Sequence, residues 1–391
     1  MKTPIFNFHD LILVLTLSVC LLLVIFQLLL SKQKVIASRL LSLFFICVGV
    51  SALCNLLLWN NYLHIESAFA KASVAWGISF ALVGKSVFLY LYVVSITREN
   101  FRFESRQWLH FINFIVVIGL LLVGALDSER LRFTSPTQTA FSISLVNDFW
   151  HYLKMLPVVY AISAVWVASH YKKQLKEFYS SLSLDGPQWL MLLTLGFAIN
   201  WSWSLAVHII GQTAGTNTAD SFGILDNYIT FILVNALFVY SLLYAHQLLE
   251  PKNIVKEKVA VAVDEPAPEL IARIQNGMDG QQLYLKQNLN IEEFAKHVGI
   301  HYREVSAIIN KHFNTNFFEF VNSYRVKRAQ EMLLDPAYAE MTILDILLES
   351  GFNSKSAFHR FFKRYTGMSA AEYRKQKSVS DTASVVNAKS E

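Results

Sequence analysis

The sequence predicts an all-α protein: a bundle of seven transmembrane helices, followed by a cytoplasmic all-helical domain with two helix-turn-helix units. Three observations predict it. Hydrophobic residues make up 54% of the 391 residues and are concentrated before residue 250. Seven stretches in that part are about 20 residues long and nearly free of charge, as a bilayer-spanning helix requires. After residue 268, apolar residues recur at helical spacing on one face of short segments.

Each of the seven apolar stretches is long enough to cross a bilayer as a helix, which bonds every backbone amide within its own segment. The first stretch lacks the basic start and small-residue cleavage site of a signal peptide, so we expect it to be retained. The predicted spans are 9–30, 40–59, 72–96, 109–126, 152–171, 189–210 and 228–249.

Lysine and arginine in the short connecting loops predict the orientation of the bundle, because loops rich in these residues stay in the cytoplasm. The loops 31–39, 97–108 and 172–188 hold nine of them, whereas the N-terminus and the loops of the opposite side hold four. We therefore expect the N-terminus outside the membrane and the C-terminal domain in the cytoplasm.

Lys85 lies near the middle of the third predicted span, where a charge is costly and indicates a functional site by default. Its counter-charge is expected from an aspartate near the outer ends of the spans or from an anionic ligand. The aspartates are Asp10, Asp148, Asp220 and Asp226. One hypothesis is a ligand cavity formed with Asn200, His208 and Asn235. The alternative is that Lys85 is neutral or bonded to carbonyl and hydroxyl groups of neighbouring helices.

Residues 290–374 contain one pattern twice: an apolar helical stripe, a glycine turn and a second stripe that carries polar residues. The turns are Gly299 and Gly351, and Ser354 is expected to cap the last stripe. The first pair of stripes is Ile291, Phe294, Ala295, Val298 and Val305, Ile308, Ile309, Phe313. The second pair is Ile343, Ile346, Leu347 and Phe358, Phe361, Phe362, Tyr365. Two helices joined by a short glycine turn are typical of a helix-turn-helix unit.

The sequence of this region also resembles that of a known protein family. The run GFNSKSAFHRFFKRYTG at 351–367, followed by Glu372, Tyr373 and Arg374, resembles the C-terminal signature of AraC/XylS-type transcription regulators. The runs IIN at 308–310 and NFFEFVNSYRVKRAQEMLLD at 316–335 resemble the part of that family that joins its two helix-turn-helix units. The resemblance covers roughly residues 268–377 and implies a bacterial regulator that binds promoter DNA.

The resemblance also implies roles for single residues in contact with double-stranded DNA. Base edges would be read by Arg303, Ser306, Lys355, Ser356, His359 and Arg360. Lys363 and Arg364 would contact phosphates. The chain departs from the family pattern at His301, where a small N-cap residue is usual, at Leu347, where alanine is common, and at Ala370, where proline is usual.

Catalytic chemistry is not indicated by any motif. The sequence contains no His-Glu-x-x-His, no Gly-x-Ser-x-Gly and no phosphate-binding Gly-x-x-x-x-Gly-Lys-Ser/Thr run. Cys20, Cys47 and Cys54 lie in apolar segments without a second ligand pattern, and we interpret them as packed thiols. We therefore expect no enzyme activity, no cofactor and no metal.

The predicted organisation is a transmembrane domain at 1–250, a cytoplasmic linker at 251–268, a DNA-binding domain at 269–377 and a disordered tail at 378–391. It predicts a one-component transcription regulator anchored in the bacterial cytoplasmic membrane. The lipid bilayer, a small-molecule or membrane-protein signal and a second copy of the chain on DNA are the expected partners. The alternative is a membrane receptor or transporter with an accessory DNA-binding module.

Overall fold

A computed structural model describes residues 7–30, 35–60, 63, 65–98, 101–136, 138–180, 187–214, 216–243 and 267–375. Within these ranges the regular elements are helices, apart from one isolated bridge between Tyr179 and Asn290. The chain divides into two compact units. The bundle unit comprises Met1–Tyr171 and Leu184–Asn253, and the C-terminal unit comprises Lys172–Ser183 and Ile254–Glu391. The predicted all-α class is thereby confirmed.

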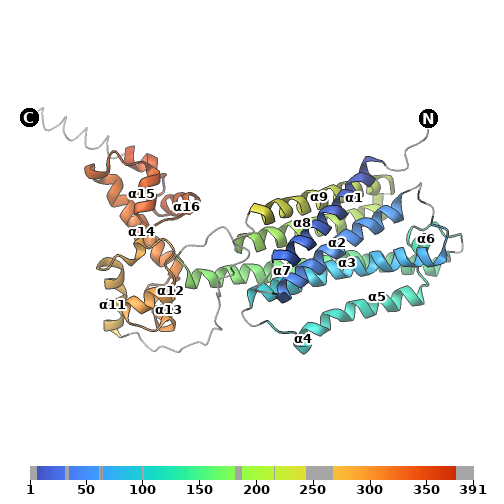
Figure 1. Cartoon of the computed structure of the whole chain (residues 1–391), viewed down its shortest axis with the longest axis horizontal. Coiled ribbons are helices and arrows are strands. Elements are labelled where there is room, and N and C mark those ends of the chain that lie inside the picture. The colour runs from blue at the N-terminus through green and yellow to red at the C-terminus, as the bar shows by residue number, and fades with distance from the viewer. Residues whose placement is uncertain are drawn as a thin grey trace, which may run out of the picture. The chain divides into compact units, whose positions relative to one another are not determined.

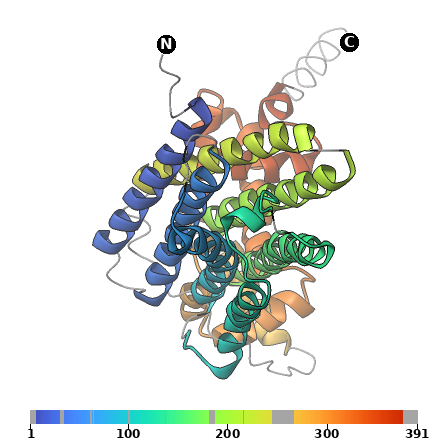
Figure 2. The ribbon, with the colours of Figure 1, turned by 90° about the vertical axis from the view of Figure 1, so that its right-hand side faces the viewer.

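The bundle unit contains long helices that run alongside one another (Figure 1). They are α1 (Phe8–Leu30), α2 (Val35–Trp59), α3 (Ala68–Thr97), α5 (Ile112–Val123), α7 (Ala140–Phe178), α8 (Pro187–Ala214) and α9 (Thr216–Leu243), with short α4 (Ser105–Trp108), η1 (Leu109–Phe111) and α6 (Ser128–Leu131) between them. Helix α2 packs against α1 and α3, and α9 packs against α1 and α8. Figure 2 views the teal and green helices of this unit nearly along their axes.

Seven helices among the described residues are long and apolar enough to cross a membrane, in agreement with the predicted number of spans. Their sides that face away from the bundle core carry large apolar residues, as Ile115 and Ile199 illustrate with exposed fractions of 66% and 69%. Such residues are costly in water and suit a lipid environment. The fifth of these helices, α7, extends beyond the predicted span 152–171 at both ends, since it begins at Ala140. Helix α7 continues past residue 171 to Phe178, because the polar run that follows contains no glycine or proline to stop it.

The C-terminal unit is built from short helices around two separate apolar cores. Its elements are α11 (Pro268–Asp279), η2 (Leu283–Leu285), α12 (Ile291–Val298), α13 (Tyr302–Lys311), α14 (Phe317–Leu334), η3 (Pro336–Tyr338), α15 (Ile343–Glu349) and α16 (Lys355–Thr366). The first core joins α11, α12 and α13, and the second joins α15 and α16. Helix α14 contributes Phe317 to the first core and Phe318 to the second, so it connects the two cores.

Two predicted segments fall partly or wholly outside the described residues. The linker at 251–268 is described only at its last two residues, and the tail at 378–391 is not described. Helix α11 follows the linker, and its Ile274 and Met278 are buried in the first core beside α12.

Candidate nucleic-acid interface

Helices α12 and α13 form the first helix-turn-helix unit. Asn290 caps α12, because its side-chain oxygen accepts a hydrogen bond from the backbone amide of Glu293 at 2.8 Å. Gly299 then turns the chain in the left-handed region, at φ 70°, where a side chain would be strained. The apolar faces of both helices are buried in the first core. The opposite side of α13 is therefore the side that can meet a ligand.

The two predicted DNA contacts of the first unit lie on α13 and are both half-buried. His301 caps the helix by accepting a hydrogen bond from the amide of Arg303 at 3.3 Å. The side chain of Arg303 folds back on its neighbour: its Nε donates to the Tyr302 hydroxyl at 3.1 Å. The amide of Asn310 lies 3.5 Å from the hydroxyl of Ser306. The side chain of Arg303 is thus held by the residue beside it.

The second helix-turn-helix unit consists of α15 and α16. Thr342 and Asp345 form a reciprocal capping box at the start of α15, in which each side chain bonds the other residue's backbone amide. Gly351 makes the turn at φ 92°. Ser354 caps α16 as predicted, since its hydroxyl accepts from the amide of Ala357.

The predicted aromatic core of the second unit is confirmed for three of its four members. Phe358, Phe361 and Phe362 are buried, whereas Tyr365 is 48% exposed and was wrongly assigned to the stripe. Tyr365 follows the last core residue and lies near the end of α16, where the helix reaches the edge of the core. The unusual Leu347 and Ala370 are both buried within the second core.

All six residues predicted to contact DNA from α16 are exposed. They are Lys355, Ser356, His359, Arg360, Lys363 and Arg364. Arg364 forms a two-point ion pair with Glu319 at the start of α14, one branch of which measures 3.3 Å. This bond raises the pKa of Arg364, so the guanidinium stays charged. The carboxylate of Glu319 therefore competes with any phosphate for Arg364.

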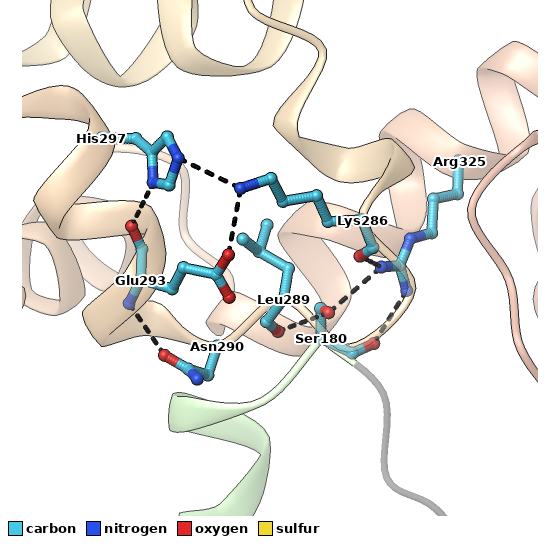
Figure 3. A network of polar contacts seen from close by, with 7 residues as sticks. All are labelled: Ser180, Lys286, Leu289, Asn290, Glu293, His297 and Arg325. Carbon is cyan, nitrogen blue, oxygen red and sulfur yellow. Dashed lines mark hydrogen bonds and ion pairs between the residues drawn. The ribbon is translucent and has the colours of Figure 1, made fainter.

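A segment that motif reasoning missed also belongs to the C-terminal unit. Residues 172–180, comprising the last turns of α7 and the two residues after it, are called the α7 end below. Figure 3 shows Ser180 of this segment beside Leu289 and Arg325. Its amide donates to the carbonyl of Leu289 at 3.0 Å, and its hydroxyl donates to the same oxygen at 2.6 Å. The carbonyl of Ser180 accepts a hydrogen bond from Asn322 of α14 at 2.8 Å.

Arg325 of α14 joins the α7 end to the backbone that precedes the first helix-turn-helix unit and to the second unit. Arg325 is 1% exposed, and its guanidinium donates to the backbone carbonyl of Tyr284 at 2.7 Å. It donates to the carbonyl of Lys286 at 2.7 Å as well (Figure 3). It also donates to the hydroxyl of Ser180 at 3.2 Å and lies over the ring of Phe352 in the second unit. Burial lowers the pKa of Arg325 to about 9, which still leaves it charged at neutral pH.

The bundle unit contains a cluster of polar side chains around Asp226. Its carboxylate accepts hydrogen bonds from the Asn200 amide at 3.0 Å and from the Ser204 hydroxyl at 2.9 Å. The ammonium of Lys154 donates to the Ser204 oxygen at 2.8 Å. Lys85 lies 5.6 Å from the ring centroid of Trp201, close enough for Lys154 and Asp226 to act on its charge. We call these six residues the Asp226 cluster.

The four residues predicted to line a ligand cavity are only partly brought together. Lys85 and Asn200 belong to the Asp226 cluster. The ring of His208 packs edge-on against that of His151, with centroids 4.7 Å apart. Asn235 instead donates to the carbonyl of Phe231 in its own helix at 2.8 Å. In the part of the chain that the structure describes, no group of three or more His, Cys, Asp or Glu side chains could hold a metal ion.

Comparisons with known proteins concern the C-terminal unit. The family described as "Helix-turn-helix domain" matches residues 294–376. An uncharacterized HTH-type transcriptional regulator of Staphylococcus aureus (strain COL) is 29% identical over 102 residues, which is 26% of this chain and 13% of that protein. The melibiose operon regulatory protein of Escherichia coli (strain K12) is 32% identical over 89 residues, 23% of this chain and 28% of that protein.

No solved structure gives a significant match. The alignments cover 13% of the Staphylococcus aureus protein and 28% of the Escherichia coli protein, so the chain aligns with less than a third of either relative. The relatives are named as transcription regulators rather than enzymes. The matched family and these relatives support a DNA-binding transcription regulator whose helix-turn-helix domain lies at residues 294–376.

Proposed function

We propose that this chain is a membrane-anchored one-component transcription regulator. The observation that carries the proposal is the joining, in one chain, of seven helices apolar enough to cross a membrane with a helix-turn-helix domain. The loop charges favour an N-terminus outside the bacterial cytoplasmic membrane. An odd number of crossings then brings the C-terminal unit to the cytoplasm, where the chromosome lies. The bilayer holds the protein while the C-terminal unit binds promoter DNA.

Each helix-turn-helix unit would place its recognition helix, α13 or α16, in the major groove of successive turns about 34 Å apart. Arg303 and Arg360 are the proposed readers of guanine, because arginine bonds both acceptors of that base. The proposed neighbouring contacts are Ser306, Lys355, Ser356 and His359. Lys363 and Arg364 would bind phosphates, Arg364 after release from Glu319. Two membrane-held chains on paired half-sites would gain effective concentration as a homodimer.

Chromosomal occupancy of the full chain tests this proposal. Wild type should occupy a small set of promoters, and Arg360→Ala should cost about 1 to 3 kcal/mol and relax one base position. Lys363→Ala should weaken binding to all sites evenly, because a phosphate contact carries no sequence information. Equal losses and equal base preferences in both variants, at matched membrane levels, would contradict these roles. Substrate uptake into proteoliposomes without promoter occupancy would favour the alternative of a transporter with an accessory module.

We further propose that the Asp226 cluster is the signal input and binds a small anion. Among the described residues of the cluster, two lysines, Lys85 and Lys154, accompany one carboxylate. An unbalanced charge within a membrane bundle is costly, and an anionic ligand such as a carboxylate would balance it. Trp201, over which Lys85 lies, offers an apolar wall beside the charge.

A reporter strain tests the signal input without knowledge of the ligand. Lys85→Met and Lys154→Met should each abolish the response of the reporter to the growth condition that activates wild type. Lys71→Met is the matched control, because Lys71 pairs with Glu129 at 2.6 Å, away from the cluster. A normal response in Lys85→Met at equal protein level would remove this site from the proposal and leave the DNA-binding function standing.

A further inference from the structure

The α7 end is attached to the C-terminal unit by specific hydrogen bonds. Each backbone and side-chain polar group of Ser180 is bonded: the amide and hydroxyl donate to Leu289, and the carbonyl accepts from Asn322. Ser180 is fully buried. A polar residue that is removed from water keeps its place only when such bonds replace water. The segment is therefore seated in a formed site.

In the first unit this site includes the residues where DNA is expected to approach. Tyr179 pairs through the backbone with Asn290, the cap of α12, and the Phe178 ring lies 6.3 Å from that of Tyr302, the first residue of α13. In helix-turn-helix complexes the first helix crosses the DNA backbone, and the N-terminal residues of the second meet the bases. Phosphate groups bind favourably at helix N-termini, because the backbone amides there are free to donate and the helix dipole is positive at that end.

The α7 end reaches the second unit as well. The ammonium of Lys176 lies 5.5 Å from the ring centroid of Phe318, and the charges of Arg360 and Arg364 act on it. Ser180 lines a small cavity together with Ala357 and Arg360 of α16. One segment thus touches the start of one recognition helix and the flank of the other. The α7 end leaves the predicted contacts of α16 exposed, but it occupies the cap of α12 and the start of α13, which a duplex engaging both recognition helices is expected to approach.

We propose that the α7 end is a built-in competitor of operator DNA, docked where the duplex must pass between the two recognition helices. This inference rests on the proposed DNA-binding function. Both recognition helices engage DNA only when the segment leaves Asn290, Tyr302 and Asn322. Because α7 is one helix from Ala140 to Phe178, a shift of its part in the bundle unit changes how readily its end undocks. A signal received by the bundle thereby alters the fraction of chains competent to bind.

A reversible disulfide tests the competition. Tyr179 and Asn290 face each other across an antiparallel bridge, in a register that places Cα atoms about 4.5 Å apart, within the range of a disulfide. The variant Tyr179→Cys/Asn290→Cys is prepared as the full chain in nanodiscs. The native Cys20, Cys47 and Cys54 all lie in the bundle unit. The probe is a duplex of about 30 base pairs, spanning successive major grooves, selected from a random pool by wild type.

The oxidised variant should bind this duplex roughly tenfold more weakly than the same protein after reduction, because the lock removes the competent state. Each single cysteine variant is a matched control that oxidation should leave unchanged. Independently, Phe178→Ala removes the ring that packs beside Tyr302 without changing a residue of α13 or α16, and should tighten binding roughly threefold.

The remaining outcomes overturn the inference in distinguishable ways. Equal or tighter binding by the oxidised form would show that the docked segment does not compete with DNA. Failure of the cysteine pair to bridge in DNA-free protein would show that the segment is not docked. If wild type selects no duplex from the pool, the proposed DNA-binding function itself fails, and the inference falls with it.

Discussion

The two helix-turn-helix units follow one sequence plan, yet their turns stand in different surroundings. A Cβ added to Gly299 in the first unit would meet no atom within 4 Å. A Cβ added to Gly351 in the second unit would lie 2.5 Å from the carbonyl oxygen of Tyr284 and 3.2 Å from Nε of Arg325. The first turn is free, whereas the second packs against the backbone that precedes the first unit. The repeat is thus symmetric in its local pattern and asymmetric in what its turns touch.

The largest expected effect comes from adding a methyl group at each glycine turn, which tests this asymmetry directly. Gly351→Ala adds a clash with fixed backbone to the strain of a positive φ, and should destabilise the second unit by about 3 kcal/mol or more. Gly299→Ala is the matched control and should cost the first unit about 1 kcal/mol, from the conformational strain alone. Hydrogen exchange of the full chain in nanodiscs reports the opening free energy of each unit separately. Equal losses in the two variants would contradict the difference in surroundings.

Arg325 is expected to have the next largest effect. Arg325→Leu leaves the carbonyl of Tyr284 without its donor and that of Lys286 with only the amide of Leu289, which should cost about 2 kcal/mol. Both units should lose protection against exchange together, because Arg325 bonds the backbone that leads into the first and lies over Phe352 of the second. Arg328→Leu is the control: it removes a half-buried arginine of the same helix that bonds Tyr338. Loss of protection confined to one unit would show that Arg325 does not link them.

Local pattern explains which features were predictable from the sequence. The seven apolar helices, the glycine turns and the buried Phe358, Phe361 and Phe362 all follow from the spacing of residues near one another in the chain. The contact between Ser180 and Arg325 joins residues 145 positions apart, and no periodicity encodes it. One signal was present: Arg325 lies four residues after Val321 and four before Ala329, in a buried row of α14.

The residues of the candidate DNA-binding site were also predictable only as far as local sequence determines them. The resemblance gave six residues on α16 that the structure places at the surface. It gave no indication that Arg303 bonds Tyr302 or that Arg364 pairs with Glu319, because these partners depend on rotamers and on the placement of α14. In the bundle, Asp226, whose charge acts on Lys85, was among the aspartates expected as its counter-charge, whereas no pattern in the sequence pointed to Lys154.

The helix caps offer a smaller contrast between the units. Ser354 is a favourable N-cap, so Ser354→Ala should destabilise α16 by about 1 kcal/mol. His301 is an unfavourable one and makes a long 3.3 Å bond, so His301→Ser should stabilise α13 by a few tenths of a kcal/mol. Exchange of the first-turn amides of each helix measures both changes. Destabilisation by His301→Ser would show that packing of its ring on Tyr302 matters more than the cap.

The smallest stability effect is expected at the two predicted DNA-binding arginines that are bonded within the protein, Arg303 and Arg364. Arg303 is held by a neutral hydroxyl, whereas Arg364 is held by the Glu319 carboxylate in an ion pair whose arginine side chain is 51% exposed. Such a pair contributes about 0.2 to 1 kcal/mol, so Glu319→Gln should change the stability of the second unit little. Its effect on DNA should be larger, because Arg364 then becomes available to a phosphate.

For Glu319→Gln we expect tighter binding and a salt dependence steeper by about one counterion. Tyr302→Phe, which frees Arg303 from its hydroxyl partner, should instead sharpen the preference for guanine with an unchanged salt slope, because Arg303 is proposed to read a base. Binding isotherms at several salt concentrations measure both. If both variants change the salt dependence of binding alike, Arg303 and Arg364 share one role. The proposed division, with Arg303 reading a base and Arg364 binding a phosphate, would then be wrong.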